Sequence, residues 1–159
     1  MNRMQKYLAA CAGTLLSLSA AVYGQQTASV TLETKSITVE YAVPAADNRI
    51  VGIFHTPFDL AFKGLNVPKG LYTLYVLTDS PRRQLAVNKA TGDQAAKYDP
   101  QQDLGRVPML MIRPPAPVTD CKITLSKIAP IAAEIKVVCN DKAASTSFRL
   151  DRGANDSQW

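Results

Sequence analysis

The side chain best suited to acid–base chemistry or metal binding is His55, the single histidine of the chain. Asp59 follows four residues later, but on an extended strand that spacing separates two side chains on one face by about 13 Å. A shared metal would therefore need a bend at Pro57. The chain also lacks a nucleophile elbow, a phosphate-binding glycine loop, a zinc-protease motif and a dinucleotide fingerprint. We therefore predict no metal, no cofactor and no catalytic residue. His55 is kept as a candidate ligand-binding residue, with a surface or structural histidine as the alternative.

A second candidate site is the long polar segment from Asn88 to Arg106, NKATGDQAAKYDPQQDLGR. Connections of this length are uncommon in compact domains and are often functional or mobile. Side chains of this segment that could line a small-ligand or ion site are Lys89, Tyr98, Asp99, Asp103 and Arg106. The alternative interpretation is a surface loop held in place by Asp–Arg hydrogen bonds.

Cys121 and Cys139 are the two cysteines beyond the first 24 residues, and both lie in alternating strand-like segments. A hairpin centred near Pro130 would place Ile123 opposite Val137 and the two cysteines opposite each other. Close pairs in an antiparallel ladder bring Cα atoms to roughly 4.5–5.5 Å, which a disulfide can span. We therefore predict a Cys121–Cys139 disulfide, with two buried free thiols as the alternative.

The sequence pattern predicts that the elements positioning these residues are β-strands. Ser29 to Val43 alternates apolar and polar residues with the period of a half-buried strand. Leu71 to Thr78 is apolar on both faces and predicts a central strand. Further strands are expected at residues 50–54, 58–62, 84–88, 107–113, 121–127, 134–139 and 143–150. Eight or nine short strands without a convincing helix predict an all-β domain, an antiparallel jelly-roll or immunoglobulin-like sandwich, although a barrel fits the same periodicity.

Residues 1–24 have the layout of a secretory signal peptide: basic Arg3 and Lys6, an uncharged run, and small residues before Gln25. The uncharged run is shorter than the ~20 residues of a membrane-spanning helix. A retained anchor and a lipidated Cys11 are the alternatives. We predict cleavage before Gln25, a domain over residues 25–150, a flexible tail over 151–159, and a periplasmic or secreted location without a membrane span.

The charge of the chain excludes one class of partner. Removing Arg3 and Lys6 from the 18 basic residues leaves 16 against 13 acidic ones, and the tightest basic cluster is only Arg82-Arg83. Nucleic-acid binding requires a basic stripe that neutralises phosphates, so we predict no nucleic-acid partner. The partner expected is a small ligand or an envelope protein.

Three stretches of the chain carry a resemblance to a known family. They are LNVPKGLYTLYVL (65–77), VNKATGDQAAKYDPQQDLGRVPM (87–109) and PAPVTDCKITL (115–125). The chain resembles the bacterial domain of unknown function 2911 family over about residues 28–150, with one large gap. The resemblance implies an exported bacterial protein with a β-sandwich fold. The family carries no established activity, substrate or catalytic residue that could be transferred.

The chain departs from the family pattern after the Tyr-x-x-Pro that stands here as Tyr41 to Pro44. Family members usually have a longer insert there, with an Ile-Phe-Gly stretch and a Trp-Arg-x-Gly-Ala-Asn run. The usual Trp of the long loop is also absent, and Cys121 and Cys139 stand where other residues are more common. If the Trp-Arg segment builds the family's site, this chain has lost it. We therefore expect a non-catalytic binding or envelope-associated module. The alternatives are a hydrolase or metal-dependent enzyme using His55 with loop carboxylates, and a purely structural envelope protein.

Overall fold

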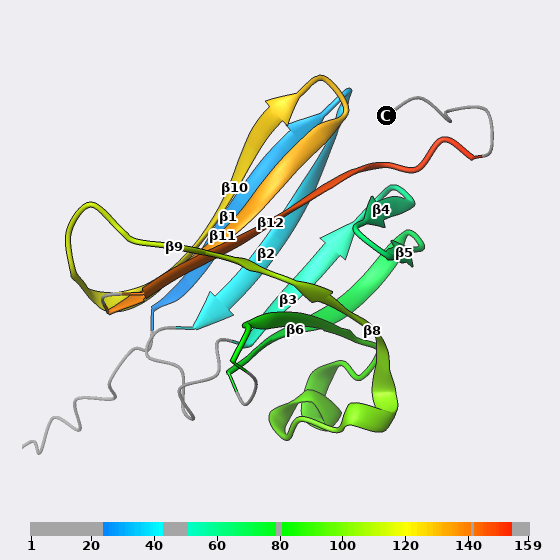
Figure 1. Cartoon of the computed structure of the whole chain (residues 1–159). Coiled ribbons are helices and arrows are strands. Elements are labelled where there is room, and N and C mark those ends of the chain that lie inside the picture. Colours follow the sequence, from blue (N-terminus) through cyan, green and yellow to red (C-terminus); the bar gives the residue numbers. More distant parts are fainter. Residues whose placement is uncertain (1–23, 43–50, 79–80, 141, 154–159) are drawn as a thin grey trace, which may run out of the picture.

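The structure is a computed structural model that describes residues 24–42, 51–78, 81–140 and 142–153. The predicted signal peptide before Gly24, the segment 43–50 where an insert is expected in the family, and the tail beyond Gly153 lie outside the described residues. The described chain forms two antiparallel sheets that face each other, which confirms the predicted all-β sandwich (Figure 1). Within the described residues, no helix is long and apolar enough to cross a membrane.

The strands divide between the two sheets as follows. Sheet A runs in the order β1 (Gln25–Leu32), β2 (Lys35–Ala42), β3 (Val51–Thr56), β6 (Gly70–Leu77), β7 (Gln84–Asn88) and β8 (Asp103–Pro108). Sheet B runs in the order β10 (Val118–Ala129), β11 (Ala132–Asn140), β12 (Lys142–Leu150), β4 (Leu60–Phe62) and β5 (Leu65–Val67). β9 (Leu110–Ile112) also pairs with β12.

The core lies between the sheets because alternate residues of each strand point inward. Ile37, Val39 and Tyr41 of β2 are buried while their neighbours are more exposed, as the alternation in Ser29–Val43 predicts. The largest fully buried inward side chains are Phe54, Leu32, Ile37, Leu60, Leu85, Ile135, Val39, Val67, Val87, Val107 and Val137.

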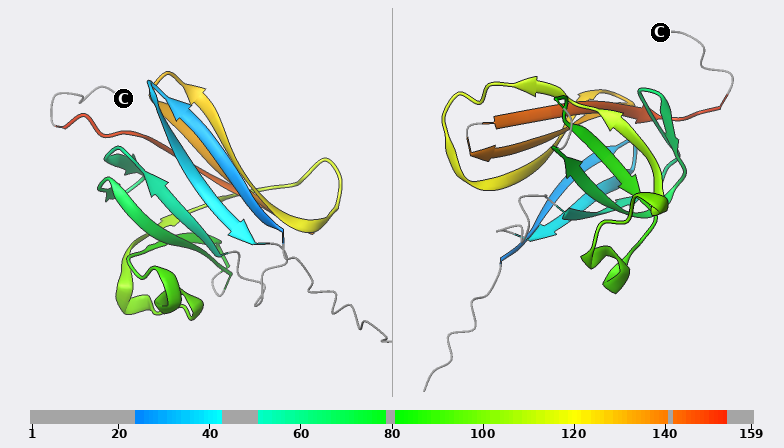
Figure 2. Two further views of the ribbon diagram at one scale, coloured as in Figure 1. Left: turned by 180° about the vertical axis from the view of Figure 1, so that it is seen from behind. Right: turned by 60° about the horizontal axis from the view of Figure 1, so that its bottom comes forward.

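The two layers meet along both sides of the sandwich (Figure 2). β1 of sheet A contacts β10 of sheet B, and β5 of sheet B contacts β8 of sheet A. The second contact depends on Gly105, because a Cβ there would lie 2.5 Å from Leu65 Cδ1. A glycine in β8 therefore allows the side chain of Leu65 to reach the opposite sheet.

The described residues form twelve strands rather than the eight or nine expected from the sequence. The segment 107–113, expected as one strand, is divided between β8 in sheet A and β9 in sheet B. The chain changes sheet at Met109, whose side chain is buried. The short strand β5 was not expected from the sequence, because it is only three residues long and pairs locally with β4.

β6 is a central strand of sheet A, as its two-sided apolar pattern predicts. Leu74 and Val76 point into the sandwich, whereas Thr73 and Tyr75 point outward and are also buried. Their cover is the long loop after β7, which contains the 3₁₀ helices η1 (Gly92–Ala96) and η2 (Pro100–Gln102) and lies beside β6 and β8 in Figure 1. Tyr75, Leu77, Ala86 and Tyr98 form a small second core there.

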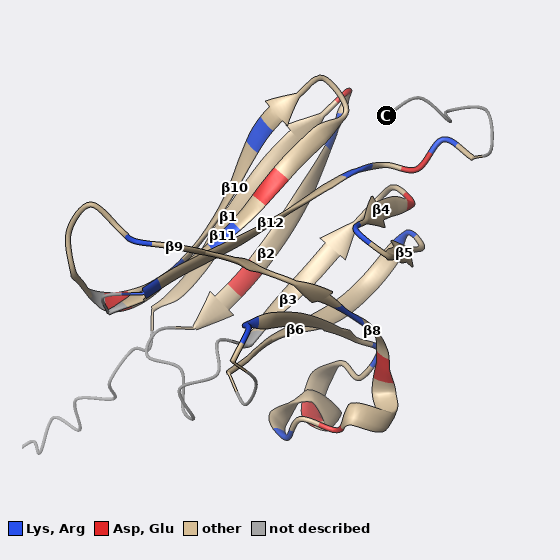
Figure 3. Ribbon diagram, viewed as in Figure 1, with Lys and Arg blue, Asp and Glu red and all other residues tan. Residues whose placement is uncertain are grey.

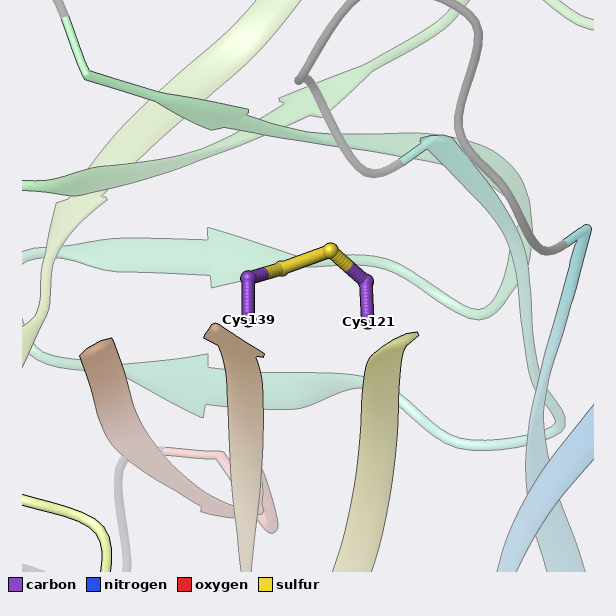
Figure 4. Close-up of a disulfide and its surroundings, with 2 residues drawn as sticks. All are labelled: Cys121 and Cys139. Carbon is purple, nitrogen blue, oxygen red and sulfur yellow. A yellow bond between two sulfur atoms is a disulfide. The ribbon is translucent and has the colours of Figure 1, made fainter. Parts of the chain in front are cut away.

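The β10–β11 hairpin has the predicted register. Ile123 pairs with Val137, and Leu125 pairs with Ile135. Cys121 and Cys139 are joined by a disulfide, with their Cα atoms 4.2 Å apart, which confirms the predicted bond (Figure 4). Both cysteines pack against the main core, and the bond joins β10 to β11 at the open end of the hairpin.

Candidate functional site

The carboxylate of Asp103, at the start of β8, is the centre of the hydrogen bonds that hold the long loop. Only 8% of its side chain is exposed. Oδ1 accepts a hydrogen bond from Asn88 Nδ2 at 2.9 Å. Oδ2 accepts one from the Tyr98 hydroxyl at 2.6 Å and one from Arg106 Nε at 2.8 Å. These three donors balance the burial of the charge, as a buried carboxylate requires.

Asn88 links the two ends of the loop. It ends β7, is fully buried, and its Oδ1 accepts a hydrogen bond from the backbone N–H of Ala90 at 2.9 Å. Its Nδ2 also donates to the carbonyl of Asp99 at 2.9 Å. Asp99 in turn caps η2, since its Oδ1 accepts from the backbone N–H of Gln101 at 2.9 Å. One amide therefore fixes the loop where it leaves β7 and where it returns.

Two outward side chains of β6 fasten the middle of the loop. Thr73 Oγ1 donates to the carbonyl of Ala90 at 2.6 Å, and the Tyr75 hydroxyl donates to the carbonyl of Ala95 at 2.7 Å. The rings of Tyr75 and Tyr98 also pack with their centroids 4.8 Å apart. The loop is thus a fixed layer on the outer face of sheet A.

Burial raises the pKa of Tyr98 from its ordinary 10.0 to about 12, and the hydrogen bond to Asp103 adds to this effect. The hydroxyl is therefore protonated at neutral pH, so it donates to the Asp103 carboxylate. The hydrogen bond to Asp103 also raises the pKa of Arg106. In the described residues, no buried side-chain nitrogen or oxygen lacks a hydrogen-bond partner.

The structure brings three of the predicted loop residues, Tyr98, Asp103 and Arg106, into one hydrogen-bonded cluster. Asp99 joins it through its backbone carbonyl. The exposed Lys89 contributes a backbone bond, from its N–H to the carbonyl of Gln102 at 2.8 Å.

His55 lies apart from the cluster, exposed on the outer face of β3 and paired with Thr38 and Leu71 of the neighbouring strands. β6 separates β3 from β7, so His55 and the loop share one face of sheet A without sharing a strand pair. Across the described part of the chain, no three His, Cys, Asp or Glu side chains lie close enough to hold a metal ion.

A groove of about 480 Å³ opens on the outer face of sheet A between η1 and strands β1–β3. We call it the loop groove. Most of its surface is apolar, and the exposed side chains of Glu40 and Asp93 are among the residues that line it. Gln25 Nε2 donates to Glu40 Oε2 at 3.3 Å. The residues that line this groove are Gln25, Glu40, Tyr41, Ala42, Ile53, Thr73, Gly92, Asp93, Ala95 and Ala96.

A second groove, of about 730 Å³, lies between the β10–β11 turn and the β4–β5 turn. We call it the hairpin groove. Phe148 points into the core, so its neighbours Ser147 and Arg149 point outward and place this groove on the outer face of sheet B. The residues that line it are Ala61, Phe62, Lys63, Gly64, Asn66, Ile128, Ile131, Ala132, Ser147, Phe148 and Arg149.

Sequence reasoning missed Asn88 and both grooves. Asn88 had a usable signal, because an Asn that ends an apolar strand must find hydrogen-bond partners if it is buried. The grooves had none, since their lining residues come from segments far apart in the chain. Charges of both signs are scattered over the described ribbon without a basic stripe (Figure 3).

The fold and these sites define a small antiparallel β-sandwich domain with one long loop fixed against an outer face. The family described as "Protein of unknown function (DUF2911)" matches residues 52–148, which is more than half of the chain. The chain therefore belongs to this family, in agreement with the resemblance read from its sequence. The matched span runs from β3 to β12 and includes the loop and both cysteines. No curated protein and no solved structure gives a significant match to the chain.

Proposed function

We propose that this chain is an exported, non-catalytic binding protein that holds a small ligand in the loop groove. Export is supported by the signal-peptide layout of residues 1–24 and by the disulfide, since such bonds persist in oxidising compartments. A non-catalytic role is supported by the Asp103 cluster. Its acidic, phenolic and guanidinium groups bond to one another and hold the loop in place.

The observation that carries the proposal is the loop groove itself. Its volume is within the ~300–1,000 Å³ of ordinary ligand pockets. One wall, η1, is fastened to β6 through Tyr75, so the groove is preformed and binding need not order the loop. Ile53, which is 38% exposed, supplies apolar surface, while Glu40 and Asp93 can accept hydrogen bonds. We therefore expect a ligand with an apolar body and an amine or hydroxyl donors.

The test is a thermal-shift screen of the exported protein against amines, sugars, cell-wall fragments, small acids and metals, with a chelator control. A ligand at 100 times its dissociation constant adds roughly 2.7 kcal/mol of stability, or several degrees for a domain of this size. Ile53→Glu should abolish the shift because it puts a charge on the groove surface. Leu71→Glu is the matched control, since Leu71 is 50% exposed on the same face and does not line the groove.

The screen also distinguishes the proposed binding function from the alternative, a hydrolase or metal-dependent enzyme using His55. His55 is on the same outer face as the groove, two residues along β3 from Ile53. His55→Ala should leave ligand binding unchanged if the protein only binds. A metal hit, or a loss of stability with chelator that His55→Ala removes, would replace this proposal with the alternative.

A further inference from the structure

The first strand of the domain begins at the residue before which the signal peptide is expected to be cut. Gln25 starts β1, pairs with Ala42 of β2, and is exposed. Gly24 is also exposed, and apart from its chain neighbours no atom lies within 4 Å of the position that a Cβ there would occupy. Cleavage before Gln25 during export would therefore leave an amino terminus in open space at the end of a paired strand.

A glutamine at an amino terminus carries both groups of a ring-closing reaction, so the step is unimolecular. The lone pair of the α-amine attacks the side-chain carbon Cδ, and the new C–N bond closes a five-membered lactam. The Cδ–Nε2 bond breaks, and the nitrogen leaves as ammonia with a proton from the amine. At neutral pH the positive charge of the terminus therefore departs as ammonium ion. The step needs no oxidant, reductant or other reactant.

This lactam is compatible with the position of Gln25 in β1. The ring keeps one hydrogen on the backbone nitrogen and leaves the backbone carbonyl unchanged, so the donor and acceptor opposite Ala42 remain. The ring fixes a backbone torsion as proline does, but no residue precedes it, so no clash with a preceding residue arises. Ala28 and Val30 point into the core, so by alternation Gln25 points to the outer face of sheet A.

Gln25 is also part of the wall of the loop groove on that face. Its Nε2, the nitrogen lost on cyclisation, donates to Glu40 Oε2 at 3.3 Å. The described residues that line the groove include two acidic ones, Glu40 and Asp93, and no Lys or Arg. Lys97, one residue after the lining residue Ala96, is the nearest cation along the chain and is the same in both forms. A terminal ammonium at Gln25 would therefore offset part of the acidic charge, and the lactam would not.

We propose that Gln25 becomes a pyroglutamate after export, and that this modification removes the terminal ammonium from the loop groove and so favours cationic ligands there. The effect on ligands rests on the proposed function, since it acts on the same groove. A like charge about 10 Å from a bound cation, close to the protein surface, weakens its binding about threefold. Cyclisation should therefore strengthen the binding of an amine by about this factor and leave a neutral ligand unaffected.

Intact-mass measurement of the exported protein tests the modification. We expect the mass of residues 25–159, less two hydrogens for the disulfide and one ammonia. The terminus should also resist Edman degradation until pyroglutamyl aminopeptidase removes residue 25. Gln25→Asn is the matched control, because it keeps the amide but could close only a strained four-membered ring, so it should retain its ammonia. A free α-amine on Gln25 after prolonged incubation at neutral pH would overturn the proposal.

Calorimetric titration with 2-phenylethylamine measures the effect on the loop groove. The cyclised protein should bind this amine about threefold more tightly than Gln25→Asn, which keeps a terminal ammonium. Acetylating the α-amine of Gln25→Asn should raise its affinity toward that of the cyclised protein. Added salt should reduce the difference, because it screens exposed charges. Neutral 2-phenylethanol should bind both proteins equally, and equal binding of the amine would overturn the effect of the modification on the groove.

The possible outcomes distinguish this inference from the proposed function. If the lactam forms and the amine binds neither protein, the modification stands and the proposed ligand site is wrong. If the amine binds and the terminus keeps its ammonia, the binding function stands and the modification is wrong. A chain cut before another residue would overturn the modification alone, and a chain that keeps residues 1–24 would overturn both the modification and export.

Discussion

At the scale of single residues, the groups that could do chemistry in the long loop are bonded to one another. Asp103 accepts from Asn88 at the end of β7, from Tyr98 in the loop and from Arg106 in β8. Both oxygens of this carboxylate are therefore occupied by donors of its own chain. Its contribution is to hold the loop against sheet A.

Tyr98→Phe should make the protein less stable at neutral pH, by about 1 kcal/mol for the lost hydrogen bond to Asp103. The difference should shrink as the pH rises from 10 to about 12. The folded pKa of Tyr98 is raised to about 12, whereas an unfolded tyrosine titrates near 10, so this stability is complete below pH 10 and is lost through the folded pKa. Denaturant unfolding of both proteins at several pH values measures the difference. If the unfolding free energies of the two proteins differ by the same amount at every pH, the prediction is wrong. As a control, the pH dependence of this difference should be smaller when both proteins also carry Asp103→Asn.

The sequence indicated that most residues of this cluster lie in one segment, but it could not predict which of their side chains bond to one another. Tyr98, Asp103 and Arg106 are close in the chain, and an Asp–Arg bond within the loop was a foreseeable alternative. Asn88 and Tyr75 decide where the loop lies, and their roles follow from burial on the outer face of sheet A. Burial on that face depends on the loop itself, so local pattern could not predict it.

At the scale of elements, local pairing was predictable and distant pairing was not. The β10–β11 register follows from alternation around a turn near Pro130, because both strands are adjacent in sequence. The change of sheet at Met109 does not follow from any pattern. Val107 and Leu110 read as one apolar run, and their separation depends on β7 and β12, which lie far apart in the chain.

The Cys121–Cys139 bond should stabilise the domain by roughly 3 kcal/mol, because it closes a loop across the hairpin in the unfolded chain. Replacing both cysteines with Ser should lower the unfolding free energy by this amount in denaturant titrations. Reductant should lower the stability of the unmodified protein to a similar value and leave the double variant unchanged. If reductant lowers the stability of both proteins equally, reduction of the Cys121–Cys139 bond does not explain the loss of stability.

At the scale of the whole molecule, each of the two outer faces of the sandwich carries a groove. The fixed loop covers part of sheet A and leaves the loop groove beside it, while sheet B carries the hairpin groove. The core between them is continuous and joins both sheets. A ligand can therefore reach either groove from solvent without opening the core.

The exported form of the protein should begin at Gln25, which is the first residue of β1. Cleavage there would preserve the whole pairing of β1 with β2, from Gln25 opposite Ala42 to Leu32 opposite Lys35. A later cut would remove pairs from the strand that packs against β10. Intact-mass measurement of protein purified from the periplasm or medium should therefore give residues 25–159, less two hydrogens for the disulfide and one ammonia for the Gln25 lactam. An acylated chain beginning at Cys11 would indicate a lipid anchor instead, and an uncleaved chain in the cytoplasm would contradict export.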